Sequence, residues 1–292
     1  MTETVALKDY IELTKPRIAT MVLVVTALGY FFAVRESGMF PGWPEFILTL
    51  VATALVGAGA SVLNQVIERD VDAKMERTRN RPIPGGRIDP SNALYIGVAM
   101  VMGGCLLMLF QVNLLAAFLS LQSAFLYVLV YTPMKRLTWW NTSVGAIPGA
   151  MPTLIGWAAA TGTLGWGAWV LFAILFIWQH PHFFAIAWMY KKDYARGGLQ
   201  MLSVVRPDGV SMFRQIIGYS ILLLAVSLIP LLLGQAGWVY ALGAGAAGIV
   251  MLEAARRFFK ERDEATARTT LRASLLYFPV LLAASGLDTW LN

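Results

Sequence analysis

Residues 61–90 gather amide, carboxylate and guanidinium side chains at the end of a long apolar run. Asn64, Glu68 and Asp72 follow one another at intervals of four residues, which places them on one face of a helix over about 12 Å. Asp70 falls on a different face. Carboxylates are unfavourable at the C-terminal end of a helix, and two of them four residues apart repel each other. A cation must offset them, and Mg²⁺ suits one or two carboxylates that share it with substrate phosphates.

A basic loop follows these acids directly. Four cationic side chains lie within eight positions: Lys74, Arg77, Arg79 and Arg81. The segment 82–86, with two prolines and two glycines, then ends any helix. Guanidinium groups bind phosphate oxygens in pairs, so this loop predicts a site for a phosphorylated substrate. A solvated loop would carry the same charges, but Asn64 lies a turn deeper in the apolar run than Glu68, which favours a functional site.

A second polar group interrupts a later apolar run, residues 168–190. Three side chains lie near its middle: Gln179, His180 and His182. The chain has only these two histidines, which lie about 200° apart on a helix, so they share a pocket only if Pro181 distorts the backbone. Zinc is not expected, because no cysteine or third histidine is available as a ligand. Asp193 follows about three turns beyond His182, among basic residues that include Lys191.

The elements that carry these residues are apolar runs of membrane length. Of 292 residues, 58% are apolar and only 14% are charged, which argues against a soluble enzyme, a disordered chain and a disulfide-stabilised secreted domain. Nine runs can be read: Ile18–Val34, Phe46–Ile67, Ala93–Phe110, Leu114–Tyr131, Val144–Ala160, Ala168–Tyr190, Ile216–Leu233, Trp238–Leu252 and Ala273–Leu287. They do not alternate as barrel strands do, so we expect an all-α polytopic membrane protein with nine transmembrane helices around a central cavity.

Basic residues set the expected orientation. Of the 23 Lys and Arg residues, 22 lie before the first run or in the connections after the second, fourth, sixth and eighth runs; the other is Arg35. The positive-inside rule makes the N-terminus cytoplasmic, and nine spans place the C-terminus outside. This pattern explains the net charge of +6 without a nucleic-acid partner. The N-terminal residues resemble neither a signal nor a transit peptide, so we expect a bacterial plasma membrane and an active site near its cytoplasmic side.

Both polar groups follow an even-numbered apolar run. Each combines polar residues within the run with an acid and a basic loop at the cytoplasmic end. Four runs separate the two groups, which predicts a parallel internal repeat of runs two to five and six to nine. We therefore expect residues 1–292 to form one domain built from two related halves, with the chemistry in a central cavity between the two helix ends.

These motifs resemble those of the intramembrane aromatic prenyltransferases, and most closely those of the heme-modifying branch. The branch pattern Asn-x-x-x-Glu-Arg-Asp-x-Asp, then Met-x-Arg-Thr-x-x-Arg-Pro, is present in full from Asn64 to Pro82. Gln65 departs from the wider family, which has Asp there. The pattern Trp-Gln-x-Pro-His-Phe follows at Trp178–Phe183, and Asp193 begins the Asp-Tyr pair that this branch has further on. Two further stretches also fit: Lys15–Arg17 and Tyr131–Arg136.

The resemblance implies transfer of farnesyl from farnesyl diphosphate to a vinyl group of heme b, with water addition, by a bundle in the lipid membrane. It implies Mg²⁺ as the cofactor, with these ligands: Asn64, Glu68, Asp72 and Asp193. It implies diphosphate binding by Lys74, Arg77, Arg79, Arg81 and Lys191. Catalytic residues would be the four metal ligands and His182, which stands where aromatic-acid enzymes have Asp; His182 and, ranked lower, His180 would bind heme. Downstream partners would be a heme A synthase or a terminal oxidase assembly protein.

Two alternative functions stay open at the level of sequence. The first is prenylation of a small aromatic acid or quinone precursor, which would require a second Asp-rich motif, whereas this chain retains only Asp193. The second is transport of a phosphorylated or metal-bound solute, which would place charges near the middle of the bilayer. The acids here lie near the cytoplasmic interface instead.

Overall fold

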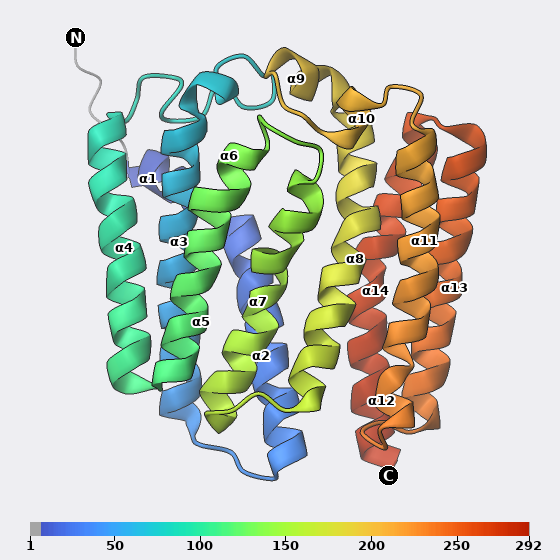
Figure 1. Cartoon of the computed structure of the whole chain (residues 1–292). Helices are drawn as coiled ribbons and strands as arrows, with labels where there is room; N and C mark the ends of the chain where they lie inside the picture. The colour runs from blue at the N-terminus through green and yellow to red at the C-terminus, as the bar shows by residue number, and fades with distance from the viewer. Residues whose placement is uncertain (1–6, 292) are drawn as a thin grey trace.

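The computed structural model describes residues 7–291, which form a bundle of α-helices without a β-strand in that range (Figure 1). The long helices are α2 (Pro16–Ser37), α3 (Trp43–Asp72), α4 (Pro90–Gln111), α5 (Leu114–Phe125), α7 (Asn141–Thr161), α8 (Trp166–Met189), α11 (Val210–Ser227), α13 (Trp238–Glu261) and α14 (Glu264–Leu291). The shorter pieces are α1 (Leu7–Leu13), the π-helix η1 (Leu126–Tyr131), α6 (Thr132–Met134), α9 (Lys191–Arg196), α10 (Leu202–Val205) and α12 (Ile229–Leu232). The prediction of an all-α polytopic membrane fold is confirmed.

Judged by length and apolar composition, the predicted number of spans is too high by one. Eight helices within residues 7–291 are long and apolar enough to cross a membrane, against nine predicted. The difference is the run Val144–Ala160, which forms α7: this helix has 21 residues but contains Pro148, Pro152 and several Ser, Thr and Gly residues. Its neighbours explain this composition. It runs through the bundle beside α2, α5 and α8, and Ala150–Ala159 is continuously buried, so protein rather than lipid surrounds it (Figure 1).

Glycines let α2 and α7 approach closely. A Cβ at Gly29 of α2 would collide with the backbone of Thr153, and a Cβ at Gly156 of α7 would collide with the carbonyl of Thr26. Small residues at such crossings allow the close backbone packing on which helix association in membranes depends. The contact fixes α2, and therefore the residues at its N-terminus, against the core of the bundle.

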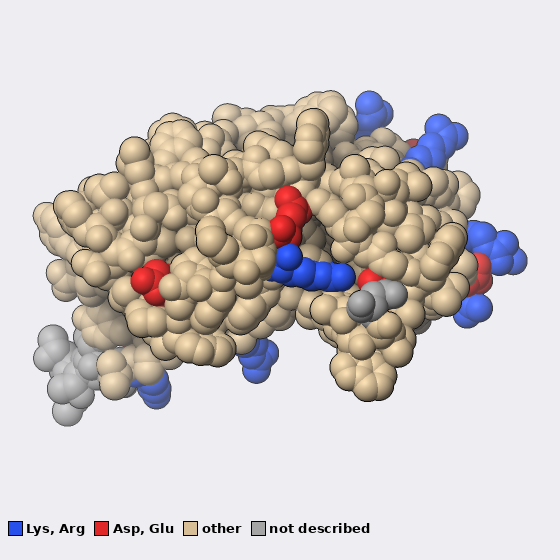
Figure 2. All heavy atoms as spheres, turned by 90° about the horizontal axis from the view of Figure 1, so that it is seen from below, with Lys and Arg blue, Asp and Glu red and all other residues tan. Residues whose placement is uncertain are grey.

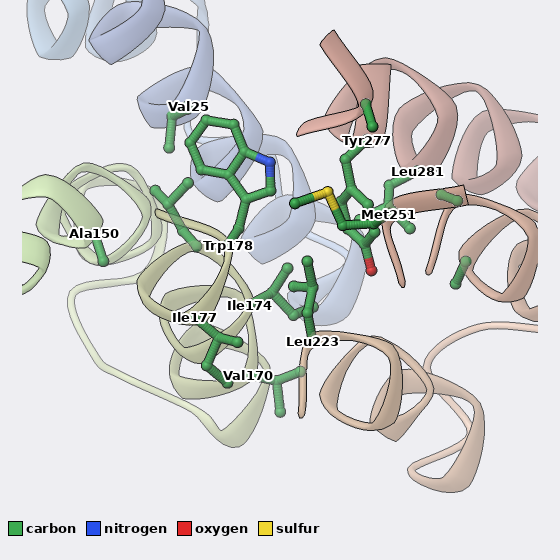
Figure 3. Packing of buried hydrophobic residues seen from close by; sticks show 14 of the residues in the cluster. Val25, Ala150, Val170, Ile174, Ile177, Trp178, Leu223, Met251, Tyr277 and Leu281 are labelled. Atoms are coloured by element: carbon green, nitrogen blue, oxygen red, sulfur yellow. The ribbon is translucent and has the colours of Figure 1, made fainter. Parts of the chain in front are cut away.

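Two groups of helices make up the rest of the bundle. α3, α4, α5 and α7 pack as consecutive neighbours, and so do α8, α11, α13 and α14, with α14 returning to α8 (Figure 1). The second group surrounds a core in which Trp178 lies among Ile174, Met251, Tyr277 and Leu281 (Figure 3). The internal repeat and the single domain stay predictions, although the two groups contain the predicted halves.

Functional loops gather at one end of the bundle, where α3 and α8 end. The loop that follows α3 ends where α4 begins. Asp89 caps α4 by accepting hydrogen bonds from the N–H groups of Ser91 and Asn92, and Pro90 occupies the first helical turn. The opposite end of the bundle, where α2 ends and α3 begins, presents a largely uncharged face (Figure 2). Arg35 is the basic residue in the last turn of α2 at that end. The charge asymmetry read from sequence therefore corresponds to the two ends of the bundle.

Candidate active site

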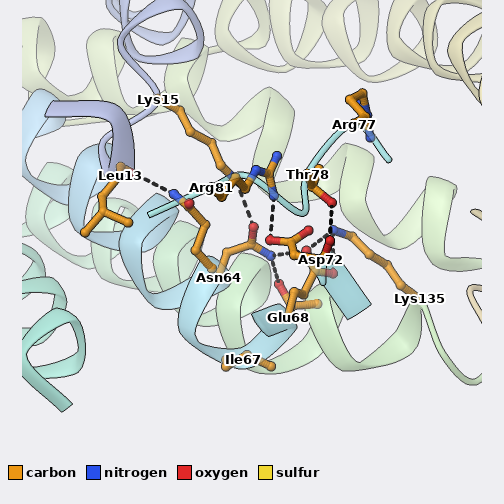
Figure 4. Close-up of polar contacts among 12 residues, drawn as sticks. Leu13, Lys15, Asn64, Ile67, Glu68, Asp72, Arg77, Thr78, Arg81 and Lys135 are labelled. Atoms are coloured by element: carbon orange, nitrogen blue, oxygen red, sulfur yellow. Dashed lines mark hydrogen bonds and ion pairs between the residues drawn. The ribbon is translucent and has the colours of Figure 1, made fainter. Parts of the chain in front are cut away.

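The three residues at four-residue spacing form one buried cluster at the end of α3 (Figure 4). Asn64, Glu68 and Asp72 are 1%, 6% and 0% exposed. The Nδ2 of Asn64 donates to the Oε2 of Glu68 at 3.0 Å and to the Oγ1 of Thr132 at 3.0 Å. Asp70, in contrast, lies at the surface beside Arg69. Ionised side chains are rarely buried without partners, so the cluster requires cations nearby.

Three cations from separate segments meet this cluster (Figure 4). Lys15 donates from its Nζ to the Oδ1 of Asn64 at 2.9 Å. The Nζ of Lys135 lies 2.8 Å from the Oε1 of Glu68, and the Nη1 of Arg81 lies 2.7 Å from the Oδ2 of Asp72. Positive charge so placed around an acid pair suits an anion that binds together with a divalent metal.

Lys15 reaches the cluster from a strained backbone. It lies just before α2 with φ at 51°, a left-handed conformation that a non-glycine residue adopts at a cost, and Pro16 follows it. Loss of hydration, together with the charges of Arg81 and Lys135, lowers the pKa of Lys15 to about 7. The side chain is therefore charged below neutral pH and neutral above it. An arriving anion would favour the charged form.

A π-helical segment aims residues of the fourth run at the cluster. Pro133 has no N–H and would clash with the carbonyl four residues earlier, which favours the wider turn of η1 just before it. The Oγ1 of Thr132 donates to the carbonyl of Tyr127 at 2.8 Å, five residues back, and accepts from Asn64. The segment thereby directs Thr132 and Lys135 toward α3.

The cluster fits a Mg²⁺ ion. The Oδ1 of Asp72 is buried and has no hydrogen-bond partner, although the Oδ2 of the same carboxylate binds Arg81. An unpaired buried carboxylate oxygen is costly unless a ligand completes it. Residues 7–291 contain no group of three His, Cys, Asp or Glu side chains that could hold a metal. Mg²⁺ needs only one or two carboxylates when substrate phosphates and water complete its six ligands, so Glu68 and Asp72 suffice.

Arg77 is held by two tyrosines that follow α8, Tyr190 and Tyr194. Its Cζ is 4.7 Å from the ring centre of Tyr190 and 5.6 Å from that of Tyr194, and its Nη2 donates to the hydroxyl of Tyr194 at 3.4 Å. Ring faces attract a guanidinium without occupying most of its N–H donors. Those donors stay available for phosphate oxygens.

Asp193 joins the two loops. Its oxygens accept hydrogen bonds from the backbone N–H groups of Glu76 and Arg77 at 3.3 Å each, and Arg196 lies 3.3 Å away. The structure therefore places Asp193 beside the backbone of Arg77, with both carboxylate oxygens already accepting hydrogen bonds. A direct role in metal binding stays a prediction.

The other predicted diphosphate ligands lie further out. Lys74 and Arg79 are exposed, and the Nζ of Lys191 lies 3.9 Å from the ring centre of Trp188. Within residues 7–291, none of the three forms a hydrogen bond or ion pair with the acid cluster, whose partners are those given above. They add positive charge around the loops, whereas Lys15, Lys135 and Arg81 contact the cluster itself.

A cavity of about 450 Å³ lies inside the bundle beneath the loops. Its walls come from α2, α3, α5, η1, α7 and α8, and Arg77 and Tyr194 line it where it meets the loops. Ile18 and Phe183 also line it and are 57% and 39% exposed, so the cavity opens to the outside between α2 and α8. A mainly apolar space beside the ionic cluster suits a hydrocarbon chain and keeps water from a reactive cation.

His180 is fully buried, and both of its ring nitrogens are occupied. Its Nδ1 lies 2.9 Å from the carbonyl oxygen of Phe176, which can only accept, so Nδ1 carries the proton. Its Nε2 then accepts from the hydroxyl of Ser143 at 3.1 Å. The ring also stacks on Tyr219, at 3.8 Å between ring centres. His180 thus links α8 to α7 and α11 and has no lone pair to offer.

His182 faces a different helix and keeps one nitrogen free. Ser274 of α14 donates its hydroxyl proton to the carbonyl of Leu271 at 2.6 Å, so its Oγ accepts from the Nδ1–H of His182 at 2.8 Å. The lone pair is then on Nε2, which has no hydrogen bond within residues 7–291. The half-buried ring stacks on Trp178 at 4.8 Å. The two histidines therefore do not share a pocket, and neither contacts the acid cluster.

Two residues that contact the acid cluster, Lys15 and Lys135, were not predicted as site residues from the sequence. Both stretches, Lys15–Arg17 and Tyr131–Arg136, match the family pattern and lie where the first run begins and the fourth ends. A basic residue directly at the cytoplasmic end of a span is a usable signal, because it lies at the depth of the acids on a neighbouring span.

Comparison with known proteins places this architecture in a family. The sequence pattern of the UbiA prenyltransferase family matches residues 22–278. The chain is 47% identical to the protoheme IX farnesyltransferase of Solibacter usitatus, over 97% of this chain and 99% of that protein.

Solved structures share the fold at low sequence identity. A structure of digeranylgeranylglyceryl phosphate synthase superposes with a TM-score of 0.80 at 18% identity, covering 97% of this chain and 98% of that one. A UbiA homologue from Archaeoglobus fulgidus bound to GPP and Mg²⁺ has a TM-score of 0.71 at 14% identity, covering 95% and 99%. At these identities the structural likeness concerns the fold alone.

Proposed function

Because the chain belongs to the UbiA prenyltransferase family, we propose that it transfers a farnesyl group from farnesyl diphosphate to a vinyl group of heme b. Water adds in the same overall reaction, and the products are heme O and diphosphate. The observation that carries this proposal is the buried acid cluster ringed by three cations at the loop end of an apolar cavity. The cluster suits a metal-bound diphosphate, and the cavity suits the isoprenoid.

The residues around the cluster would bind the diphosphate and stabilise it as a leaving group. The bond between farnesyl C1 and oxygen breaks, a bond from C1 to the vinyl carbon forms, water supplies a hydroxyl to the cationic vinyl carbon, and one proton leaves. Arg77 offers free guanidinium donors at the top of the cavity. Lys15, Lys135 and Arg81 add positive charge, and their attraction for the diphosphate grows as negative charge develops on the leaving group. Lys74, Arg79 and Lys191 stay predicted ligands that attract the anion from outside.

Asn64, Glu68 and Asp72 would hold Mg²⁺, with Asp193 as the remaining predicted ligand. When bound, the ion neutralises charge on the diphosphate and makes it a better leaving group. Binding would give the unpaired Oδ1 of Asp72 a partner. Arg81 and Lys135, which hold the two carboxylates in the structure, would then be freer to turn toward phosphate oxygens.

We propose that heme is held through His182. Its Nδ1–H is fixed by Ser274, which orients the ring and leaves the lone pair of Nε2 available to iron. Phe183, the next residue, lines the opening of the cavity between α2 and α8. A flat apolar acceptor at this opening would lie near the end of the cavity that Arg77 lines. A heme A synthase or terminal oxidase assembly partner stays a prediction.

The proposal is tested by offering two acceptors. Purified protein with farnesyl diphosphate and Mg²⁺ is incubated with heme b or with 4-hydroxybenzoate, and products are identified by mass spectrometry. We expect a farnesylated, hydrated heme and no prenylated benzoate. Prenylation of the benzoate alone would replace heme by an aromatic acid as acceptor, and absence of any prenyl transfer would favour a transport function.

We further propose a bacterial plasma membrane with the loops of the acid cluster in the cytoplasm, since 22 of 23 basic residues lie on that side. α1 lies near the loop end of the bundle and α14 ends at the other (Figure 1), so in this orientation the N-terminal part would be inside and the C-terminal part outside. Single cysteines at Arg79 and Gly42, in a Cys105→Ser background, should react with an impermeant thiol reagent from opposite sides of the membrane. Labelling of both from one side would overturn the orientation.

Lys15 predicts a pH dependence of substrate binding. Its pKa of about 7 in the free site means that it is charged below and neutral above that pH. Because the diphosphate binds the charged form, the KM for farnesyl diphosphate should rise several-fold as pH increases through about 7. Lys15→Arg stays charged throughout and should lack this step, while sharing any ionisation of the substrate. The same pH profile in the wild type and Lys15→Arg would assign the step to another group.

A further inference from the structure

A single glycine on the cavity wall faces empty space. Three glycines line the cavity: Gly57, Gly145 and Gly149. A Cβ at Gly145 would meet the ring of Tyr131 at 2.5 Å, and a Cβ at Gly149 would collide with the side chain of Gln179. Those two glycines make room for neighbouring side chains. A Cβ at Gly57 has no atom within 4 Å, so its missing side chain keeps part of the cavity open.

Gly57 belongs to one stripe of α3. Thr53, Gly57 and Ser61 all line the cavity at four-residue intervals, on the same helical face. Glu68 lies eleven residues beyond Gly57 on α3, which is about 16 Å along the axis at the helical rise. An extended farnesyl chain is about 14 Å long with single bonds near 1.5 Å. A chain whose diphosphate lies at the acid cluster would thus bring its last isoprene unit to the depth of Gly57.

We propose that Gly57 determines the length of isoprenoid that the cavity accepts. This rests on the proposed function in that the cavity holds the prenyl chain, but it does not depend on the acceptor. The absent side chain at Gly57 admits the third isoprene unit. Any side chain there would occupy that space, whereas the shorter geranyl and dimethylallyl chains would end before reaching it.

The test is binding of three diphosphates to the full-length protein in detergent with Mg²⁺ and no heme. Gly57→Leu should weaken binding of farnesyl diphosphate about tenfold or more, because a side chain that blocks an apolar pocket discriminates by this order. Binding of geranyl and dimethylallyl diphosphate should change by less than about twofold. Gly57→Ala should give a smaller effect in the same direction. Both substitutions replace a helical glycine by a better helix former, so the helix itself is favoured.

Gly103 supplies the matched control. It lies in α4, is exposed, and its Cβ would also have nothing within 4 Å. Gly103→Leu should leave all three affinities unchanged. Equal weakening of all three ligands by Gly57→Leu, or no change in any, would overturn the proposal. No acceptor is present in this test. A protein that prenylates a compound other than heme would therefore still show the expected selectivity for chain length. Failure of the heme proposal and failure of the Gly57 proposal can thus be told apart.

Discussion

Asp72→Asn should reduce prenyl transfer by at least about a hundredfold, the order expected when a metal ligand of a catalytic site is lost. The substitution keeps the size of the side chain and one oxygen but removes the charge that Mg²⁺ requires. Asp72 is fully buried, its Oδ1 is unpaired, and its Oδ2 is held by Arg81 at 2.7 Å. Glu68→Gln should act in the same direction, because it removes the charge of the second carboxylate proposed to hold Mg²⁺, which pairs with Lys135 in the structure.

Two measurements separate a metal effect from misfolding. Mg²⁺-dependent binding of farnesyl diphosphate, followed by calorimetry, should be lost in Asp72→Asn while diphosphate retains weak metal-independent binding to the cations. The thermal unfolding temperature should fall only modestly, since the side chain of Arg81 is 25% exposed and can turn to solvent. Asp70→Asn is the control, because Asp70 is exposed on the same helix and paired with Arg69. Wild-type turnover in Asp72→Asn, or in excess chelator, would refute the assignment of the metal site.

Spacing along one helix was enough to predict that Asn64, Glu68 and Asp72 lie together. Asn64, Glu68 and Asp72 occur at four-residue intervals in the sequence, and in the structure all three are buried, with Asn64 hydrogen-bonded to Glu68. The reason is that a helix converts such intervals into a shared face whatever surrounds it. The all-α membrane fold follows equally directly from apolar runs, and it is confirmed.

Residues from other segments could not be predicted in the same way. Lys15 lies 49 positions before Asn64, and Lys135 lies 67 positions after Glu68, so only the packing of α2 and α6 beside α3 brings them to the cluster. Lys15 also depends on a left-handed backbone that no sequence pattern announces. From charge alone, Lys15 and Lys135 could not be told apart from the other basic loop residues. Charge also gives no means of separating Lys74 and Arg79, which are exposed, from the basic residues that contact the cluster.

The count of spans was wrong for a related reason. Hydropathy measures how apolar a helix is, and a helix enclosed by other helices has no need to be as apolar as one that faces lipid. α7 has Pro148, Pro152 and many small residues because it packs closely on α2 and borders the cavity. Its composition therefore falls short of that of a lipid-facing span, although the run Val144–Ala160 counts as a ninth span in the sequence.

His182→Ala should weaken heme binding about tenfold or more and shift the Soret maximum, whereas His180→Ala should do neither. The two histidines are matched in type and lie two residues apart on α8, yet their hydrogen bonds differ. His180 has both nitrogens occupied, by Phe176 and Ser143. His182 has its proton on Nδ1, held by Ser274, and the Nε2 lone pair is free for iron.

Titration of the purified protein with heme, read from the Soret band, decides between the roles of His182. Ser274→Ala offers a second test, because it removes only the group that fixes the ring, and should therefore weaken heme binding less than His182→Ala while leaving the Soret position unchanged. If His182→Ala binds heme with an unchanged spectrum but loses turnover, the residue accepts the proton released during water addition instead. Unchanged binding together with unchanged turnover would leave His182 a structural link between α8 and α14, comparable to the link that His180 makes to α7 and α11.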